Sequence, residues 1–163
     1  MSWSRVWDRL SRSYTVIAPD LPGFGQSEKL STPTLSGMAT MLKELLGVLH
    51  LDRVTVVGNS FGAGVAIKFE NDHPQMVSHL VLVDGGYMPI IPGFMKKFIS
   101  LPGVNQGFRA LIRNATFSRK TLNRSFANPP KLPAGFLEKI EQNTMVYSRI
   151  SFDTIMNHST PLS

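Results

Sequence analysis

Val54-Thr55-Val56-Val57-Gly58-Asn59-Ser60-Phe61-Gly62 is the most informative stretch of the sequence. Its first four residues are apolar or β-branched, which predicts a strand buried on both faces of a parallel sheet. The residues from Phe61 to Asp72 predict a helix that ends before Pro74. A G-x-S-x-G sequence joins the predicted strand to the predicted helix. This setting is typical of a nucleophile elbow, a sharp turn that presents a serine side chain.

The glycines of the turn have a steric explanation. Such a sharp turn crowds the backbone around Ser60, so we expect positions 58 and 62 to hold little more than a hydrogen atom. The helix that follows offers free N–H groups and the positive end of its dipole. The amide of Phe61 is then placed to stabilise an oxyanion on an attacked carbonyl. We therefore expect Ser60 to project at the carboxyl edge of the sheet as a nucleophile, with Phe61 as the oxyanion donor.

Two simpler interpretations of these five residues remain open. They are a tight strand-to-helix turn without chemistry and a weak phosphate cradle. No lysine follows the glycines as it does in a P-loop, and the spacing differs from G-x-G-x-x-G. Nucleotide binding is therefore disfavoured, and the flanking strand and helix favour the nucleophile.

The rest of the first half also alternates helical and strand patterns. Residues 3–10 have apolar side chains at helical spacing, and Tyr14–Ala18 is rich in β-branched residues and predicts a strand. Thr34 is a suitable N-cap for an amphipathic helix that runs to Leu49. The apolar run Leu80–Val83 predicts a second buried strand. This order indicates the α/β class, with an open parallel sheet and flanking helices.

Residues 87–163 differ from this pattern in composition and charge. The chain has a net charge of +6, of which residues 1–86 contribute −1 and residues 87–163 contribute +7. The second part has most of the prolines, short helical patterns at 108–112 and 136–147, and no convincing strand. We expect a core at 1–86 and a helical segment set on the sheet at 87–163.

Composition and spacing exclude several kinds of site. The 163 residues include no cysteine, which excludes a thiol nucleophile, disulfides and thiolate metal sites. The four histidines lack the spacing of metal ligands, so neither a metal nor an organic cofactor is expected. The N-terminus has no signal-like segment, and no apolar run approaches the ~20 residues of a membrane span. A cytoplasmic location is the default expectation.

A set of motifs resembles those of the α/β-hydrolase fold family. They are the helix and strand within Trp3–Ala18, the loop Pro19–Ser27, the elbow Gly58–Gly64, the pair His73-Pro74 and the strand end Leu80–Gly85. Residues 87–163 are similar to the helical cap that many such hydrolases insert after this strand. The resemblance implies a serine hydrolase without a cofactor. Its substrate would be a small, partly apolar molecule, held between sheet and cap and cleaved at an ester or an activated carbon–carbon bond.

The resemblance also assigns roles to individual residues. It carries over Ser60 as the nucleophile and the Phe61 amide as one oxyanion donor. Asn59, directly before the serine, is similar to the residue found in carbon–carbon bond hydrolases of the meta-cleavage type and in many related esterases. Asp20 usually shapes its loop in this family and does no chemistry.

The usual acid and base of the family are missing by the same resemblance. Both follow later strands in the family, and residues 158–163 resemble the approach to the first of those strands. Asp84 ends a strand on the edge where Ser60 projects, and a minority of the family use a carboxylate there. We therefore take Asp84 as the candidate acid, with hydrogen bonding to loop amides as its simpler role. None of the histidines is well placed as the base; they are His50, His73, His79 and His158.

One strand of the family's sheet has no counterpart in this sequence. In the family it precedes a segment like residues 2–7, ends in a His-Gly loop with a second oxyanion donor, and lies between the strands equivalent to 14–18 and 54–57. Its absence would leave these two strands about 9–10 Å apart instead of ~4.8 Å. The chain thus resembles an internal fragment. We expect it to be marginally stable, and to pair 14–18 directly with 54–57 or to self-associate through exposed sheet edges.

Two further functional hypotheses remain. The chain could be a non-catalytic relative of the hydrolases, either a ligand-binding protein or a truncated remnant. Alternatively, the basic second half, in which residues 94–124 mix cationic and aromatic side chains, could bind anions, nucleic acid or a membrane surface. No nucleic-acid motif accompanies these residues, so a nucleic-acid partner is not expected. A small-molecule substrate is the expected partner.

Overall fold

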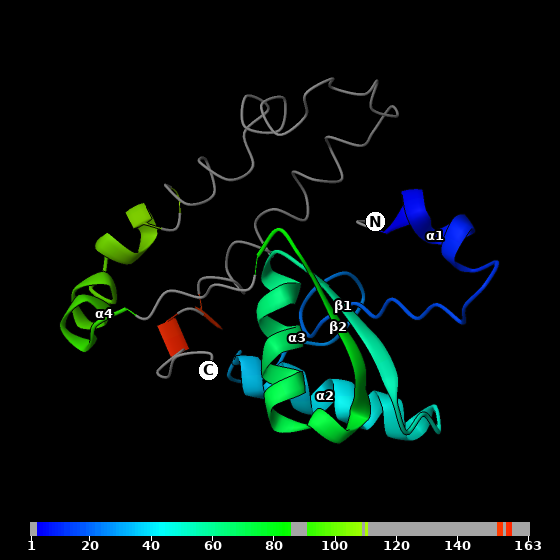
Figure 1. The fold of residues 1–163 in the computed structure, drawn as a ribbon. Helices are drawn as coiled ribbons and strands as arrows, with labels where there is room; N and C mark the ends of the chain where they lie inside the picture. Colours follow the sequence, from blue (N-terminus) through cyan, green and yellow to red (C-terminus); the bar gives the residue numbers. More distant parts are fainter. Residues whose placement is uncertain (1–2, 86–90, 109, 111–152, 155, 158–163) are drawn as a thin grey trace.

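The computed structural model describes residues 3–85, 91–108, 110, 153–154 and 156–157. In chain order, the elements are α1 (Ser4–Leu10), α2 (Leu35–Val48), β1 (Val54–Asn59), α3 (Phe61–Asp72), the 3-10 turn η1 (Pro74–Met76), β2 (Val77–Val83) and α4 (Gly93–Ile99). Strands β1 and β2 form a parallel pair in which Val57 lies opposite Val81. Helix α3 packs against both strands, and α2 packs beside α3 (Figure 1). These elements form a partial α/β fold, with two parallel strands and flanking helices, as the sequence predicts.

The two long helices follow the sequence prediction closely. The predicted helix over 61–72 is confirmed at both ends. At the start of α2, the Thr34 hydroxyl accepts a hydrogen bond from the Gly37 amide at 3.0 Å. The predicted N-cap is therefore confirmed, and one amide of the first turn that has no intrahelical acceptor is satisfied by it.

The core lies between these helices and the sheet. One cluster joins the loop before α2 to both helices and is built from Phe24, Leu35, Met38 and Val65. A second cluster joins the helices to the sheet and is built from Ala39, Leu46, Phe69 and Val77. Val54, Val56 and Leu80 pack against the second cluster. One face of the sheet is thereby buried.

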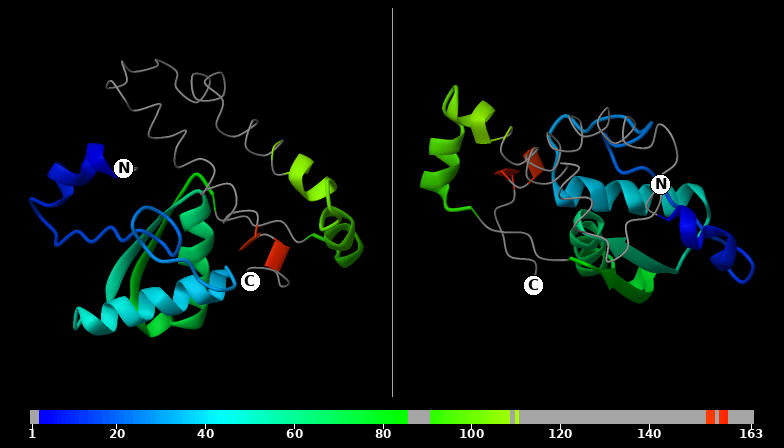
Figure 2. Two further views of the ribbon diagram at one scale, coloured as in Figure 1. Left: turned by 180° about the vertical axis from the view of Figure 1, so that it is seen from behind. Right: turned by 90° about the horizontal axis from the view of Figure 1, so that it is seen from above.

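The expectation that both strands are buried on both faces is wrong. Val57, Val81 and Val83 are between 40% and 44% exposed. Helix α3 packs on one face of the sheet with α2 beside it, and no described helix packs on the other face (Figure 2). The apolar sequence suits a strand that is buried on both faces. The described residues cover only one face of the sheet.

The expectation of a strand at 14–18 is also wrong. Residues 15–19 have no assigned secondary structure and make no backbone hydrogen bond to another described residue. They do not pair with β1, so direct pairing, one of the two outcomes expected from the sequence, is not present. A cavity of about 650 Å³ has residues 15, 17 and 18 among its lining on one side and β1 on the other. The strand lacks a partner with which to form a ladder, which explains why its β-branched sequence yields only an extended segment.

Helices α1 and α4 stand apart from the sheet in every view (Figures 1 and 2). Helix α4 agrees with the helical character predicted for 87–163, whereas the predicted helix at 136–147 lies outside the described residues. Of the predicted helix at 108–112, residues 108 and 110 are described, and both are helical. None of the helices in the described part of the chain is both long and apolar enough to cross a membrane.

Candidate active site

Ser60 lies at the turn from β1 into α3 and has an unusual backbone conformation. Its φ is 51° and its ψ is −115°, and its side chain is exposed. A positive φ with this ψ is costly for any residue other than glycine, and such strain is common at catalytic turns. The Ser60 amide donates a hydrogen bond to the Val83 carbonyl at 2.9 Å, which ties the turn to the end of β2. The sharp strand-to-helix turn expected at Ser60 is present.

The two glycines of the motif are not equivalent. A Cβ added at Gly58 would lie 2.5 Å from the Gly62 carbonyl oxygen and 2.6 Å from the Ala63 Cα. Position 58 therefore holds only a glycine without a backbone shift. A Cβ at Gly62 would meet no atom within 4 Å. The expectation that both positions are crowded is confirmed for Gly58 and wrong for Gly62.

A third glycine, Gly85, is as closely packed against the serine as Gly58 is against the helix. A Cβ at Gly85 would lie 2.8 Å from the Ser60 Cα and 2.8 Å from its carbonyl oxygen. Together with the hydrogen bond to Val83, this contact holds the Ser60 backbone against the end of β2. Sequence reasoning assigned Gly85 no role, although a glycine directly after a strand and an aspartate is a signal of close backbone approach.

The amide and the ring of Phe61 have different roles at the start of α3. Its amide is the first of α3 and has no acceptor among the described residues. Its ring packs on the ring of Phe24, with centroids 5.6 Å apart and an interplanar angle of 42°. The ring contact anchors the first turn of α3 in the core, while the amide stays free to receive an anion at the helix start.

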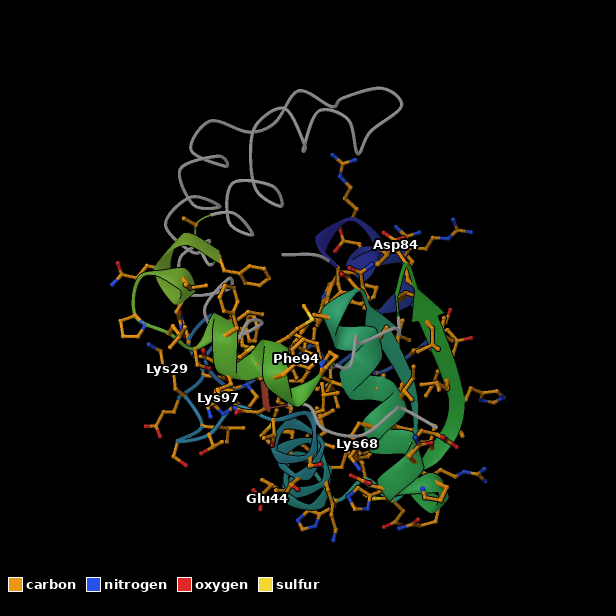
Figure 3. The ribbon with its side chains drawn as sticks, turned by 90° about the vertical axis from the view of Figure 1, so that its left-hand side faces the viewer. Lys29, Glu44, Lys68, Asp84, Phe94 and Lys97 are labelled. Carbon is orange, nitrogen blue, oxygen red and sulfur yellow. The ribbon has the colours of Figure 1, made fainter. Side chains whose placement is uncertain are left out.

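Asp84 is the first residue after β2 and lies at the same end of the sheet as the serine turn (Figure 3). It is exposed, and its φ is 51°, a left-handed conformation that aspartate tolerates better than most residues. No described residue donates a hydrogen bond to its carboxylate. Asp84 directly precedes Gly85, the residue that packs against the Ser60 backbone.

The described histidines lie at the other end of the structure from Ser60. His73 caps the far end of α3, twelve residues and about 18 Å from the start of that helix. His79 pairs with Thr55 in the sheet, five residues or about 16 Å before the serine. His50 precedes β1, and His158 lies outside the described residues. Among the described residues, no three His, Cys, Asp or Glu side chains are grouped as metal ligands.

Asp20 holds together the loop that precedes α2. Its Oδ2 accepts a hydrogen bond from the Gln26 amide at 3.1 Å, and its carbonyl accepts one from the Ser27 hydroxyl at 2.7 Å. Gly25, with a φ of 53°, packs so closely on this carboxylate that a Cβ there would clash with it. These contacts are those of a residue that shapes its loop, as the resemblance implies.

The fold and the elbow agree with the comparison to protein families. A family model described as alpha/beta hydrolase fold matches residues 1–156. The chain belongs to the α/β-hydrolase fold family.

Similar proteins of known sequence include hydrolases. Over 101 residues the chain is 40% identical to a soluble epoxide hydrolase of Corynebacterium sp., covering 61% of this chain and 34% of that protein. Over 134 residues it is 33% identical to a 2-hydroxymuconate semialdehyde hydrolase of Pseudomonas sp., covering 77% of this chain and 46% of that protein. It is also 40% identical over 102 residues to an uncharacterized protein of Mycobacterium tuberculosis, covering 62% of this chain and 30% of that protein. The chain thus spans between about a third and half of the length of these relatives.

Solved structures match over nearly the whole chain. The epoxide hydrolase CorEH matches with a TM-score of 0.67 and 26% identity, over 94% of this chain and 60% of that one. Cfl2 from Burkholderia cenocepacia matches with a TM-score of 0.69 and 23% identity, over 96% of this chain and 59% of that one. The second likeness shows the shared fold alone. Both solved chains contain polypeptide beyond the part that this chain matches.

Proposed function

We propose that this chain is the nucleophile-bearing part of a serine hydrolase. Ser60 attacks the carbonyl of an ester, or of an activated carbon–carbon bond, in a small and partly apolar substrate. The observation that carries the proposal is the turn itself. An exposed serine with φ 51° and ψ −115° stands next to the Phe61 amide, which has no acceptor in the described part of the chain.

The proposed chemistry begins with the Ser60 hydroxyl. Its oxygen forms a bond to the substrate carbonyl carbon, its proton passes to a base, and the negative charge on the carbonyl oxygen is received by the Phe61 amide. Collapse of this intermediate expels an alcohol, or a carbon leaving group stabilised by a neighbouring carbonyl, and leaves an acyl-serine. Water then releases the acid and restores the serine.

A carbonyl substrate fits the serine better than an epoxide does, although one relative is named an epoxide hydrolase. A serine that opened an epoxide would form an ether, which water does not cleave at a useful rate. A serine that attacks a carbonyl forms an ester, which water does cleave. The side chain at position 60 therefore favours acyl chemistry.

A serine phosphonylation experiment tests the nucleophile. Ethyl p-nitrophenyl methylphosphonate transfers its phosphorus to a serine oxygen and releases p-nitrophenolate. We expect Ser60 to be labelled about 10²-fold faster than the exposed Ser36 of α2, because an oxyanion donor is worth that much. Mass spectrometry of the digested chain gives both rates, with Ser60→Ala and Ser36→Ala as matched variants. Equal labelling of the two serines would favour the non-catalytic relative.

Turnover of a carboxylic ester tests whether residues 1–163 contain a base for Ser60. We expect the release of p-nitrophenol from a short-chain ester to stay far below the ~1–10³ per second of ordinary enzymes, because a serine without its base retains little activity. Fast turnover that Ser60→Ala abolishes would mean that a base lies within residues 1–163.

We also propose Asp84 as the carboxylate that orients the base. Its support is its position after β2, beside the glycine that contacts Ser60. Added imidazole can stand in for the base, so the rate of Ser60 phosphonylation should rise with imidazole concentration. Asp84→Asn should lower this slope and leave the rate without imidazole unchanged. An unchanged slope would remove Asp84 from the proposal and leave Ser60 in it.

A further inference from the structure

Helix α4 exposes large apolar side chains to solvent. Phe94 is 76% exposed, Phe98 is 62% exposed, and Leu101, just beyond the helix, is 48% exposed. Phe94 and Phe98 are four positions apart and share one side of the helix, whereas the buried Ile99 lies about 100–140° around it. A surface helix ordinarily packs its apolar stripe on the core and exposes polar residues. Helix α4 instead has an outer apolar stripe, formed by Phe94, Phe98 and Leu101.

Positive charge lies beside this outer apolar stripe. Lys97 directly precedes Phe98 and is exposed. Figure 3 views the side of the molecule that carries α4 and labels Lys97 and Phe94 on this helix. The sequence from Gly85 to Leu137 has eight Lys or Arg and no Asp or Glu. Exposed aromatic side chains among cations, without carboxylates, are typical of a helix that lies in the interface of an anionic bilayer.

The outer apolar stripe distinguishes between the partners that the sequence leaves open for the basic second half. Free anions or a nucleic-acid duplex would use the cations and leave Phe94 and Phe98 in water. A second copy of the chain would bring its own half of charge +7 against the first, which like-charge repulsion opposes. A folded protein would need pockets that match the protruding rings, whereas a bilayer accepts the rings without such pockets. An anionic lipid surface therefore fits the stripe best.

We propose that α4 docks this chain on the surface of an anionic lipid bilayer. Phe94, Phe98 and Leu101 enter the boundary between headgroups and acyl chains, and Lys97 lies at the level of the lipid phosphates. The contact is shallow, so the seven residues of α4 are long enough to make it. The docking does not depend on the chemistry of Ser60.

Binding of the whole chain to vesicles of two lipid compositions tests the proposal. One kind of vesicle contains phosphatidylcholine with about 30% phosphatidylserine, and the other contains phosphatidylcholine alone. Sedimentation with the vesicles at about 0.15 M salt gives a partition coefficient for each composition. We expect the partition coefficient to be at least about tenfold larger for the anionic vesicles, because only their headgroups attract the cations.

Two matched pairs of variants separate the outer apolar stripe from the rest of the chain. The double variant Phe94→Ser/Phe98→Ser should weaken binding to the anionic vesicles at least about tenfold, because the burial of two rings in lipid is lost. Tyr14→Ser removes a ring outside α4 that is 69% exposed, and it should leave binding unchanged. Lys97→Gln should weaken binding about fivefold. Lys43→Gln makes the same charge change at an exposed position of α2, and it should weaken binding by less than about twofold.

Quenching by lipids with brominated acyl chains tests whether the outer apolar stripe enters the bilayer. The two tryptophans of the chain, Trp3 and Trp7, are first replaced by phenylalanine. A single tryptophan is then introduced by Phe98→Trp or, as the control, by Tyr14→Trp. We expect brominated anionic vesicles to quench the emission from position 98 and to leave the emission from position 14 unchanged.

Four results would overturn the proposal. The first is equal partition into both kinds of vesicle. The second is binding without quenching at position 98, which would mean adsorption by charge alone. The third is an equal loss of binding in Tyr14→Ser and in the double variant. The fourth is self-association without vesicles that the double variant abolishes, because a second copy would then cover the stripe. Unchanged hydrogen exchange in α3 shows that the double variant is folded, and the two lipid compositions test the proposal without any variant.

Discussion

The turn that presents Ser60 is held by contacts of backbone atoms rather than of large side chains. Gly58 lets the strand approach α3, Gly85 lets the end of β2 approach the serine, and the Ser60 amide donates to the Val83 carbonyl. A residue with φ 51° and ψ −115° costs of order 1–3 kcal/mol. These contacts offset that cost. Substitution of Gly58 or Gly85 should therefore change the stability of the turn or the reactivity of Ser60.

The two motif glycines should respond differently to alanine. Gly58→Ala should lower the free energy of unfolding by about 1–3 kcal/mol, because the new methyl group overlaps the Gly62 carbonyl. Gly62→Ala should leave it unchanged or raise it by up to ~1 kcal/mol, because the site is open and alanine favours the helix. Urea unfolding of both variants measures the difference. Equal effects would mean that the backbone at 58 is not crowded.

Gly85→Ala should act on the reactivity of Ser60. The added methyl group would meet the Ser60 Cα at 2.8 Å, so the Ser60 backbone has to shift, and the position of its hydroxyl relative to the Phe61 amide changes with it. We expect phosphonylation of Ser60 to slow at least tenfold toward the rate of the exposed Ser36. Labelling of Ser36 in the same sample is the internal control. An unchanged Ser60 rate in a folded variant would show that Gly85 does not position the serine.

Asp84 should tolerate asparagine but not valine. Both aspartate and asparagine adopt the left-handed backbone at low cost, whereas a β-branched residue does not. We expect Asp84→Val to lower the free energy of unfolding by about 1–2 kcal/mol and Asp84→Asn to change it by less than ~0.5 kcal/mol. Thermal unfolding of the two variants side by side gives the comparison. A valine variant as stable as the asparagine variant would argue against the left-handed conformation.

For single residues, the sequence predicts the turn at Ser60 but not all of the contacts that hold it. Ser60, Gly58 and Phe61 follow from one short motif because the strand, turn and helix are contiguous. The roles of Gly85 and Val83 depend on which strand lies beside β1, and a single motif does not contain that information. For Gly62 the motif predicts crowding that the structure does not have, because a position in a motif does not reveal which atoms surround it.

The elements are best predicted where their stabilising contacts are local. Helix α3 begins and ends as expected, and α2 begins at the Thr34 cap that the sequence indicates. The strand expected at 14–18 is different, because a strand needs hydrogen bonds to a neighbour that its own sequence does not supply. The same holds for the face of the sheet that exposes Val57 and Val81, since burial of a strand face depends on other elements that its own sequence does not specify.

The N-cap of α2 provides an element-scale prediction. Thr34→Ala removes the acceptor of the Gly37 amide and should lower the free energy of unfolding by about 1 kcal/mol. Thr40, in the middle of the same helix, bonds back to the Ser36 carbonyl at 2.9 Å. Thr40→Ala should not destabilise the chain, because alanine is the better helix former there. Urea unfolding that shows the same loss for both variants would contradict the cap.

For the whole molecule, the described core is a nucleophile elbow set in an incomplete sheet. The elbow, α2, α3 and the two strands form a connected unit with its own buried clusters. The sheet has an open edge at β1 and a half-exposed face, and the chain spans only part of the length of its relatives. The residue pattern predicts an open parallel sheet, and the family resemblance predicts the gap beside β1, because it implies a strand between residues 14–18 and 54–57.

Residue-resolved hydrogen exchange of the monomeric chain tests most directly whether the elbow is set in a sheet with an open edge at β1. We expect the amides of residues 15–17 to exchange almost as fast as in an unfolded peptide, because they have no acceptor among the described residues. Amides of β1 that bond to β2, and those inside α3, should be protected to the level of global unfolding. Strong protection of both 15–17 and 54–57 in the monomer would mean that the two segments pair directly, and it would contradict the open sheet.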